Sequence, residues 1–312
     1  MKEPPKVIAI CGPTGAGKTK ISIEVAKAFK GEIINFDSQQ IYKELIIGTA
    51  KPSPEERENI PHHLFDEISI FEEMSAGRFI ELADRYVKEI SERGRLPILV
   101  GGTGLYLRAF EYGLFKVSSN PQIRKALKEK ASKEPASLYE ELKKLDPEYA
   151  SKIHPHDLVR IIRALEVIYT TGKAFSEFQR ETPFFQKKRY PLLKIGIFLP
   201  RRELYAKINE RVIRMIEAGW LEEVKTLYEK HGERVFEKIK AIGYKELYRV
   251  LKGELSLEEA IKSIQKETRH YAKRQFTWFK KEKNIEWFKP EEIPLILKRV
   301  ESFLKEDVPW RA

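Results

Sequence analysis

One pattern near the start of the chain constrains its fold more than any other, a glycine-rich segment of the form G-x4-G-K-[ST]. It comprises Gly12, Pro13, Thr14, Gly15, Ala16, Gly17, Lys18 and Thr19. An apolar run precedes it and a helical pattern follows, so we expect a strand, a tight turn and a helix N-terminus in succession. There, loop N–H groups and the helix dipole face one anion, Lys18 adds a cation, and the Thr19 hydroxyl suits Mg2+. The sequence predicts a phosphate-binding loop and leaves open which phosphate compound it binds.

Short apolar runs recur between amphipathic segments along the chain. The runs span 6–11, 32–36, 96–100 and 192–199, and 76–93 is one of the helical patterns between them. This alternation predicts an α/β fold, a P-loop NTPase-like parallel sheet flanked by helices. We expect the second run to form the strand beside the first.

The strand signal disappears in the middle of the chain. Residues 117–190 are polar, rich in Lys and Glu, and helical in pattern, and helices dominate again from residue 201 onward. We therefore expect a catalytic core formed by 1–116 and 191–312, with 117–190 as an inserted helical domain and a helical C-terminal region.

The composition limits where the protein acts and what it binds. No apolar stretch approaches the roughly 20 residues of a membrane span, and the N-terminus lacks a secretory signal, so we expect a cytoplasmic protein. The single Cys11 excludes a disulfide framework and fits a buried strand position. A net charge of +11 favours a polyanionic partner.

Two further strand ends carry polar residues suited to chemistry. The second strand is followed by Asp37, which could hold Mg2+, act as a general base, or cap a following helix. The third strand is followed by Gly101-Gly-Thr-Gly104, in which Thr103 is the single polar side chain. Because ligands bind at the carboxyl edge of open parallel sheets, we expect both segments at the site.

Arg211 falls on the apolar stripe of a predicted helix, together with Leu204, Ile208 and Met215. Burying an unpaired guanidinium is prohibitive, so Arg211 needs either a structural carboxylate or a bound anion. The sequence leaves both open, and the phosphate-binding loop favours the anion.

Two helical patterns carry basic faces. In 257–279 the apolar stripe includes Gln275, and the opposite face carries Lys262, Lys266, Arg269, Lys273 and Lys280. In 157–170, Arg160 and Arg163 lie opposite a stripe of Leu158, Ile161, Ile162, Leu165 and Tyr169. We expect both faces to contact a nucleic-acid backbone, the alternative being a solvated surface. For His62, His63, His154 and His156 we expect hydrogen bonding in loops or at domain junctions and no metal site.

With these residues in place, nearly the whole chain resembles the tRNA dimethylallyltransferases, the isopentenyl transferases that modify an adenosine beside the anticodon. The motifs are the glycine-rich loop, Asp37-Ser-Gln-Gln-Ile-Tyr, Ile47-Gly-Thr-Ala-Lys-Pro, Pro61-His-His-Leu, Gly101-Gly-Thr-Gly-Leu-Tyr, His154-Pro-His-Asp, Arg160-Ile-Ile-Arg-Ala-Leu-Glu, Arg211-Val-Ile-Arg-Met, Ile242-Gly-Tyr and Arg274-Gln-Phe-Thr-Trp.

The resemblance implies that the loop holds dimethylallyl diphosphate, with Mg2+ at Thr19, and that the group passes to N6 of the adenosine at tRNA position 37. Asp37 would contact the adenosine amine as the base, Thr103 would lie near the reaction centre, and Arg211 would grip the diphosphate. The residues implied to contact tRNA are Asp37, Ser38, Gln39, Gln40, Val159, Arg160, Ile161, Ile162, Arg163, Lys240, Gly243, Tyr244, Lys245, Lys273, Arg274, Gln275, Trp278 and Lys280. We expect a monomer that binds no membrane. Two alternatives stay open, a P-loop kinase acting on a small acceptor and a nucleotide-gated RNA-binding module.

Overall fold

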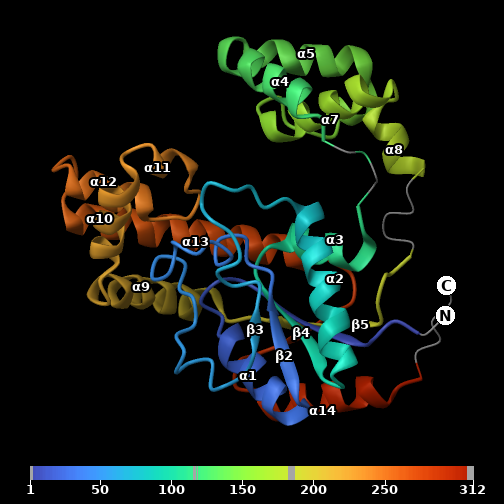
Figure 1. Cartoon of the computed structure of the whole chain (residues 1–312), viewed down its shortest axis with the longest axis vertical. Coiled ribbons are helices and arrows are strands. Elements are labelled where there is room, and N and C mark those ends of the chain that lie inside the picture. The colour runs from blue at the N-terminus through green and yellow to red at the C-terminus, as the bar shows by residue number, and fades with distance from the viewer. Residues whose placement is uncertain (1–2, 115–116, 118, 182–186, 308–312) are drawn as a thin grey trace. The chain divides into compact units, whose positions relative to one another are not determined.

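The computed structural model describes residues 3–114, 117, 119–181 and 187–307. The chain divides into two compact units, Met1–Glu111 with Arg189–Ala312, and Tyr112–Lys188 (Figure 1). We call them the sheet unit and the helical unit. The predicted domain boundary lies between residues 116 and 117, and residue 116 is outside the described residues. Residues 1–2 are outside them as well.

A six-stranded parallel sheet organises the sheet unit. Its strands are β1 (Val7–Cys11), β2 (Gly31–Asn35), β3 (His62–His63), β4 (Leu96–Gly101), β5 (Leu192–Ile197) and β6 (Ile285–Phe288). They lie in the order β3-β2-β4-β1-β5-β6, which confirms the predicted parallel sheet. The expectation that the second strand lies beside the first was wrong, because β4 pairs with both β1 and β2 and fills the place between them. The glycine turn after β4 consequently lies between the glycine-rich loop and Asp37.

Alternate residues of β1 point to opposite faces of the sheet, as a strand's period of two requires. On one face, Val7, Ala9 and Cys11 pack with α2 (Ala76–Glu92) and α3 (Gly104–Tyr112). On the other, Ile8 and Ile10 pack with α1 (Lys18–Phe29), α9 (Arg201–Glu217) and α14 (Ile293–Lys305). Cys11 is buried, and burial raises the pKa of its thiol to about 12. It is therefore a core residue and not a reactive thiol.

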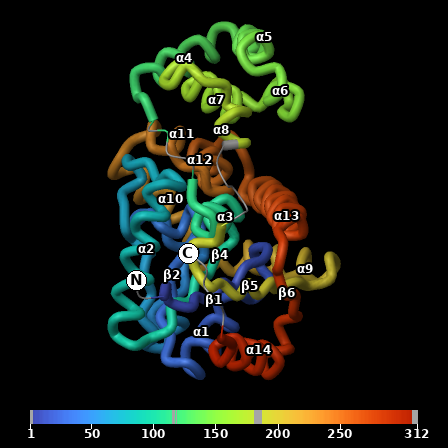
Figure 2. Tube along the Cα trace, turned by 90° about the vertical axis from the view of Figure 1, so that its right-hand side faces the viewer, coloured from blue at the N-terminus to red at the C-terminus, as the bar shows by residue number. Residues whose placement is uncertain are grey.

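A second core lies among the helices that follow β5. It joins α9 to α10 (Trp220–His231), α11 (Val235–Lys238), α12 (Tyr244–Leu251) and the first half of α13 (Leu257–Lys281), around the buried Trp220 and Tyr244. The second half of α13 packs on the sheet, where Ala272 and Phe279 are buried on its two faces. The helix thus connects the two cores: Figure 1 shows it running from α10 and α12 toward the sheet, and Figure 2 shows the chain continuing from it to β6.

The helical unit has a core of its own. It consists of α4 (Pro121–Lys133), α5 (Pro135–Leu145), α6 (Pro147–Ala150), α7 (Leu158–Thr171) and α8 (Phe175–Glu181). Prolines at the starts of α4, α5 and α6 suit the first helical turn, where no N–H partner is needed. Among the described helices of both units, none is long and apolar enough to cross a bilayer.

Candidate active site

The glycine-rich loop follows β1 and runs into α1, as predicted. Gly12 has a φ of +142°, and a Cβ there would lie 2.4 Å from the carbonyl oxygen of Ile197 on β5, so no larger residue fits. The Lys18 ammonium lies within the loop and donates to the carbonyl of Pro13 at 2.8 Å. Burial lowers the pKa of Lys18 to about 8, against the opposing charge of Asp37. The loop therefore concentrates positive potential that a bound anion would neutralise.

Asp37 is held directly after β2. Its N–H donates to Oδ1 of Asn35 at 2.9 Å, and the Asn35 amide donates in turn to the carbonyl of Leu64 at 2.9 Å. The Oδ1 atom of Asp37 accepts the N–H of Gln39 at 2.9 Å. The helix-capping alternative for Asp37 was wrong, because turns and not a helix follow it.

Thr103 lies at the end of the glycine turn that separates the loop from Asp37. Its hydroxyl accepts the N–H of Ser38 at 3.0 Å. This bond ties the turn after β4 to the segment that carries Asp37. The structure thereby brings together two predicted site residues that are far apart in sequence.

Arg211 reaches the same place from α9. Its guanidinium donates to the hydroxyl of Thr14 at 3.2 Å and to the carbonyl of Ala50 at 3.4 Å. Burial lowers the pKa of Arg211, and the charge of Asp37 acts in the opposite sense. Within the described part of the chain no carboxylate forms an ion pair with this guanidinium, so the structural-carboxylate alternative is not what this chain uses.

Thr14, Asp37 and Arg211 border a cavity of about 330 Å3 in the sheet unit. Its polar lining includes Thr14, Asp37, Ser38, Gln39, Arg211, Lys240 and Arg274, and its apolar lining includes Ile208, Val212, Met215, Trp220, Ile242 and Ile264. A cavity that joins an anion-binding loop to apolar walls suits a ligand with a charged end and an apolar end.

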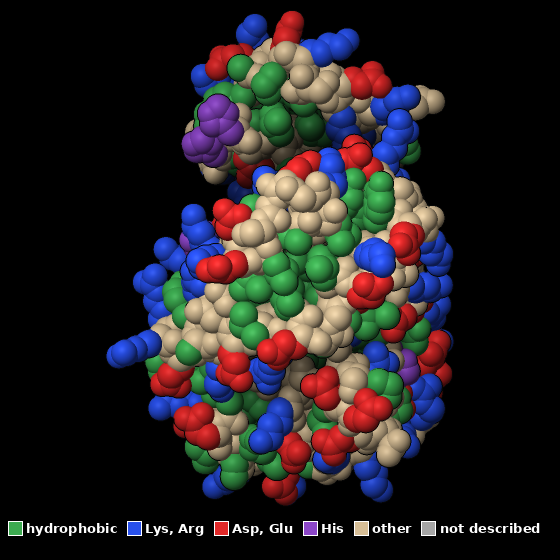
Figure 3. Space-filling view, turned by 90° about the vertical axis from the view of Figure 1, so that its left-hand side faces the viewer, with side chains coloured by type: hydrophobic (Ala, Val, Ile, Leu, Met, Phe, Trp, Pro, Cys, Tyr) green, Lys and Arg blue, Asp and Glu red, His purple; other side chains and the backbone are tan. Residues whose placement is uncertain are grey.

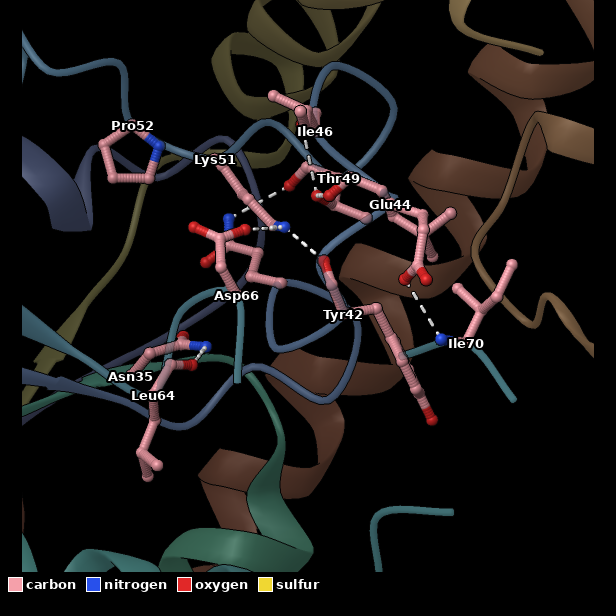
Figure 4. A network of polar contacts seen from close by, with 12 residues as sticks. Asn35, Tyr42, Glu44, Ile46, Thr49, Lys51, Pro52, Leu64, Asp66 and Ile70 are labelled. Carbon is pink, nitrogen blue, oxygen red and sulfur yellow. Dashed lines mark hydrogen bonds and ion pairs between the residues drawn. The ribbon is translucent and has the colours of Figure 1, made fainter. Parts of the chain in front are cut away.

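The segment 46–51 forms a further wall of the cavity, through Gly48, Thr49 and Ala50. The Lys51 ammonium holds it by donating to the Tyr42 carbonyl and to Asp66, the latter at 2.6 Å (Figure 4). The amide of Gln40 donates to the carbonyls of Thr49 and Ala50 at 3.0 Å each. Gln40, implied to contact tRNA, therefore braces this wall.

Near the cavity, the 240–245 segment mixes exposed and buried positions. Lys240 and Lys245 are exposed, whereas Gly243 and Tyr244 are buried. The Tyr244 hydroxyl donates to Glu223 at 2.6 Å, which leaves this side chain in the core of the sheet unit.

The basic face of α13 is exposed. Lys266, Lys273 and Lys280 are open to solvent, while Lys262 pairs with Glu258 at 2.6 Å and Arg269 donates to Oδ1 of Asn209 at 2.6 Å. Of the other residues implied to contact tRNA on this helix, Arg274 is exposed, Trp278 is half-buried beneath the guanidinium of Arg108, and Gln275 is buried.

The basic face of α7 differs from its prediction. Arg163 is half-buried and donates to the fully buried Glu166 at 2.8 Å and to the carbonyl of Val117 at 2.9 Å. Tyr169, placed on the apolar stripe, is 44% exposed. Arg160 is exposed beside Asp157, at 3.2 Å.

The remaining α7 residues implied to contact tRNA fall into two groups. Ile161 and Ile162 are buried in the core of the helical unit, whereas Val159 is 78% exposed. A buried isoleucine side chain packs and does not meet a ligand, so from this group Val159 and Arg160 have accessible side chains.

Of the two alternatives for His62 and His63, the loop was wrong, because His62–His63 form the edge strand β3. Their hydrogen bonding was expected: His62 contacts the carbonyl of Ile60 and His63 contacts Glu32, each at 2.7 Å. Among the described residues no cluster of His, Cys, Asp and Glu could hold a metal ion by itself.

Comparison with known proteins points one way. The IPP transferase family model matches residues 40–282. A tRNA dimethylallyltransferase of Anoxybacillus flavithermus is 47% identical over 303 residues, covering 96% of this chain and 95% of the relative. One from Geobacillus thermodenitrificans is 48% identical over 286 residues, covering 91% and 90%.

Solved structures agree with the sequence relatives. The tRNA isopentenylpyrophosphate transferase of Bacillus halodurans is 39% identical with a TM-score of 0.72, covering 96% of this chain and 97% of that one. A eukaryotic dimethylallyltransferase, described as acting on tRNA, is 34% identical with a TM-score of 0.80, covering 91% and 74%.

Proposed function

Because this chain belongs to the IPP transferase family, we propose that it transfers the dimethylallyl group of dimethylallyl diphosphate to tRNA, at N6 of the adenosine at tRNA position 37. The products are N6-(dimethylallyl)adenosine and diphosphate. The observation that carries the proposal is the shared cavity of the glycine-rich loop, Asp37 and Arg211.

The leaving diphosphate would lie against the glycine-rich loop. The N–H groups at the start of α1, the Lys18 ammonium and the Arg211 guanidinium would stabilise the charge that develops as the allylic carbon–oxygen bond breaks. Their pKa values are lowered in the free protein, chiefly by burial, which is the electrostatic state that an arriving anion relieves.

Mg2+ fits this arrangement with few protein ligands. Thr19 is exposed at the start of α1, and among the described residues no hydrogen bond engages its hydroxyl. Mg2+ prefers oxygen ligands and often keeps several waters while binding phosphate oxygens, so the Thr19 hydroxyl and a diphosphate would suffice. Bound there, the ion would neutralise part of the diphosphate charge.

Asp37 would serve as the base. The exocyclic N6 of adenine is a poor nucleophile, because its lone pair is conjugated with the ring. As the N6–carbon bond forms, the carboxylate of Asp37 would take the proton from N6, while the electron pair of the broken bond leaves with the diphosphate. The Asp37 N–H donates to Asn35, and the carboxylate accepts the N–H of Gln39, so both its backbone and its side chain are held in place. Thr103, tied to Ser38, lies beside it.

The tRNA would approach over exposed cations. Lys240, Lys273 and Arg274 are exposed on the sheet unit, the first and last of them at the cavity, and would neutralise backbone phosphates. The adenine must leave its stack to enter the cavity, a step that contacts on the flanking nucleotides favour. In the helical unit, Val159 and Arg160 present accessible side chains for the same substrate.

The test is to incubate the protein with unmodified tRNA and either dimethylallyl diphosphate or ATP, in the presence of Mg2+. The proposal expects a mass gain of one dimethylallyl group on a single adenosine and no ADP. Release of ADP would favour the kinase alternative, and tRNA binding without either product would favour the RNA-binding module. A monomeric state and a cytoplasmic location stay predictions.

A further inference from the structure

Gln275 lies on α13 and points into the protein, although the residues just before it face solvent. Lys273 and Arg274 beside it are exposed, whereas the side chain of Gln275 is 5% exposed. It occupies the apolar stripe of the helix, together with the buried Ala272 and Phe279. A buried amide requires partners for both its oxygen and its nitrogen.

The two ends of this amide bind the backbone of two different loops. Oε1 accepts the N–H of Thr14 in the glycine-rich loop at 2.9 Å, and Nε2 donates to the carbonyl of Gly102 at 3.0 Å. The close approach depends on Gly102, since a Cβ there would lie 2.1 Å from Nε2. The amide therefore bridges the glycine-rich loop and the glycine turn after β4.

Each bridged loop carries a group that the proposed reaction uses. The Thr14 hydroxyl accepts a hydrogen bond from the Arg211 guanidinium at 3.2 Å. The turn at Gly102 continues into Thr103, whose hydroxyl holds the N–H of Ser38 next to Asp37. One side of the Gln275 amide thus bears on the diphosphate site, and the other bears on the base.

The same helix is seated on this turn one turn further along. A Cβ on Gly104 would lie 2.1 Å from the ring of Trp278, so the indole occupies the space above that glycine. Gln275 and Trp278, three residues apart, face the same turn, as helical spacing requires.

We propose that Gln275 is a positioning residue, which sets the separation between the glycine-rich loop and Asp37. In this role its side chain does not contact tRNA. This deepens the proposed function and rests on it. A reaction in line between a base-activated amine and a leaving group is sensitive to a shift of about 1 Å in such a separation. Losing the bridge should accordingly lower kcat more than it raises KM for either substrate.

The test variant is Gln275→Leu, which keeps a similar volume and removes both hydrogen bonds. Gln265→Leu is the matched control, because Gln265 lies on the same helix and its amide donates to a single carbonyl, that of Asn209 at 3.1 Å. We expect kcat to fall roughly 10- to 100-fold in Gln275→Leu, with the Kd for tRNA and its salt dependence unchanged. The control should lose a similar amount of thermal stability and keep its kcat.

A second variant separates the two hydrogen bonds. Gln275→Glu retains an acceptor for the Thr14 N–H but places an oxygen against the Gly102 carbonyl, so we expect kcat to fall at least as far as in Gln275→Leu. Binding of inorganic pyrophosphate, measured by calorimetry without tRNA, reports on the loop alone and should weaken by less than kcat falls.

The outcomes separate this inference from the proposed function. If the wild-type protein does not prenylate tRNA, the proposed function fails. If it does, and Gln275→Leu keeps the wild-type kcat, the positioning role is wrong. Weaker tRNA binding with a shallower salt dependence would instead make Gln275 an RNA contact and also overturn the role. Equal loss of kcat in Gln265→Leu would reduce Gln275 to a general packing position.

Discussion

Arg211 in the sheet unit and Glu166 in the helical unit are both charged groups on the inner side of a helix. They differ in whether a group of opposite charge pairs with them. Glu166 is 0% exposed and accepts hydrogen bonds from the N–H of Asn120 at 2.9 Å and from Arg163 at 2.8 Å. Burial alone would raise its pKa, but bonds from Ser119 and Arg163 hold the pKa of Glu166 below its ordinary value. Arg211 meets only a hydroxyl and a carbonyl among the described residues, and its pKa is lowered by burial.

The contrast distinguishes scaffold from site. A buried charge that is paired with an opposite charge belongs to the scaffold, because removing either partner leaves the other uncompensated. A cation left with neutral partners costs free energy until an anion arrives, which is what a ligand site requires. The exposed surface does not make this distinction: Figure 3 shows Lys and Arg mixed with Asp and Glu over the face that it presents.

The largest expected effect concerns Asp37, whose charge acts on both Lys18 and Arg211. Asp37→Ala should lower kcat by about 10^2- to 10^4-fold, the usual cost of losing a general base, while tRNA affinity changes little. Single-turnover prenylation and a filter-binding Kd measure the two quantities. Unchanged turnover would remove Asp37 from the mechanism.

Removing the scaffold charge should act on stability. Glu166→Ala leaves Arg163 half-buried without its carboxylate and should cost about 3 kcal/mol in unfolding free energy of the helical unit. Below pH 4.5 the wild-type contribution should also fade, because a carboxyl with a lowered pKa stabilises the fold above its ordinary value and loses this as pH falls through the lowered one. Chemical denaturation with Glu148→Ala as control tests this, since the Glu148–Lys152 pair, at 2.8 Å, is exposed. Equal losses in both variants would contradict the scaffold role.

Removing the site cation should act on the ligand. Arg211→Gln should weaken pyrophosphate binding by about 10-fold or more, as expected for a charged hydrogen bond, and should leave the melting temperature unchanged or higher. Arg214→Gln is the control, because Arg214 is exposed on the same helix. An Arg211 variant that binds pyrophosphate normally but melts early would make Arg211 a structural residue.

The lowered pKa of Lys18 should appear in the pH dependence of donor binding. The free protein loses this proton near pH 8, so pyrophosphate affinity should fall above that pH by at most tenfold per unit, and binding there should take up a proton. Stability of the free protein should change in the other direction, rising between about pH 8 and 10.5, because the unfolded chain then binds the proton more tightly. Calorimetry in buffers of different ionisation enthalpy measures the uptake. A flat profile, matching Lys18→Met, would contradict it.

The smallest effect concerns the exposed face of α13. Lys266→Ala and Lys273→Ala should each weaken tRNA binding and lower the slope of log K against log salt by about 0.7 to 0.9, with stability changing by less than about 0.5 kcal/mol. Lys262→Ala should change the slope less, because Glu258 already engages that ammonium. If Lys266 and Lys273 variants bind as the wild type does, this face is merely solvated, and the exposed Arg160 on α7 becomes the principal candidate.

Sequence patterns predicted the sheet well and its order poorly. The strands β1, β2, β4 and β5 lie within a residue or two of their apolar runs, because strand periodicity and flanking glycines are local signals. The place of β4 between β1 and β2 is set by tertiary packing, and four apolar runs of similar composition contain nothing that ranks them. The two-residue β3 is too short to show a period.

The site followed the same division. The loop, Asp37, Thr103 and Arg211 were predicted from their residue types at strand ends and on a helix stripe, and the structure links them through Thr103–Ser38 and Arg211–Thr14 hydrogen bonds. The sequence could not predict the partner of Arg163. An Arg opposite an apolar stripe gives the same pattern whether it pairs with Glu166 or faces solvent. The inward amide of Gln275 did leave a signal, a polar residue on an apolar stripe.

The placement of β5 has a consequence for how the chain comes into being. Val7 at the start of β1 pairs with Leu192, so the whole helical unit must leave the ribosome before the first strand gains this neighbour. Contacts this distant in sequence make folding slow and leave strand edges exposed meanwhile. Gln275 and Arg211 come later still. A nascent chain therefore contains the complete glycine-rich loop long before the cavity can form. Termination of synthesis before Arg211 yields a product without that cavity.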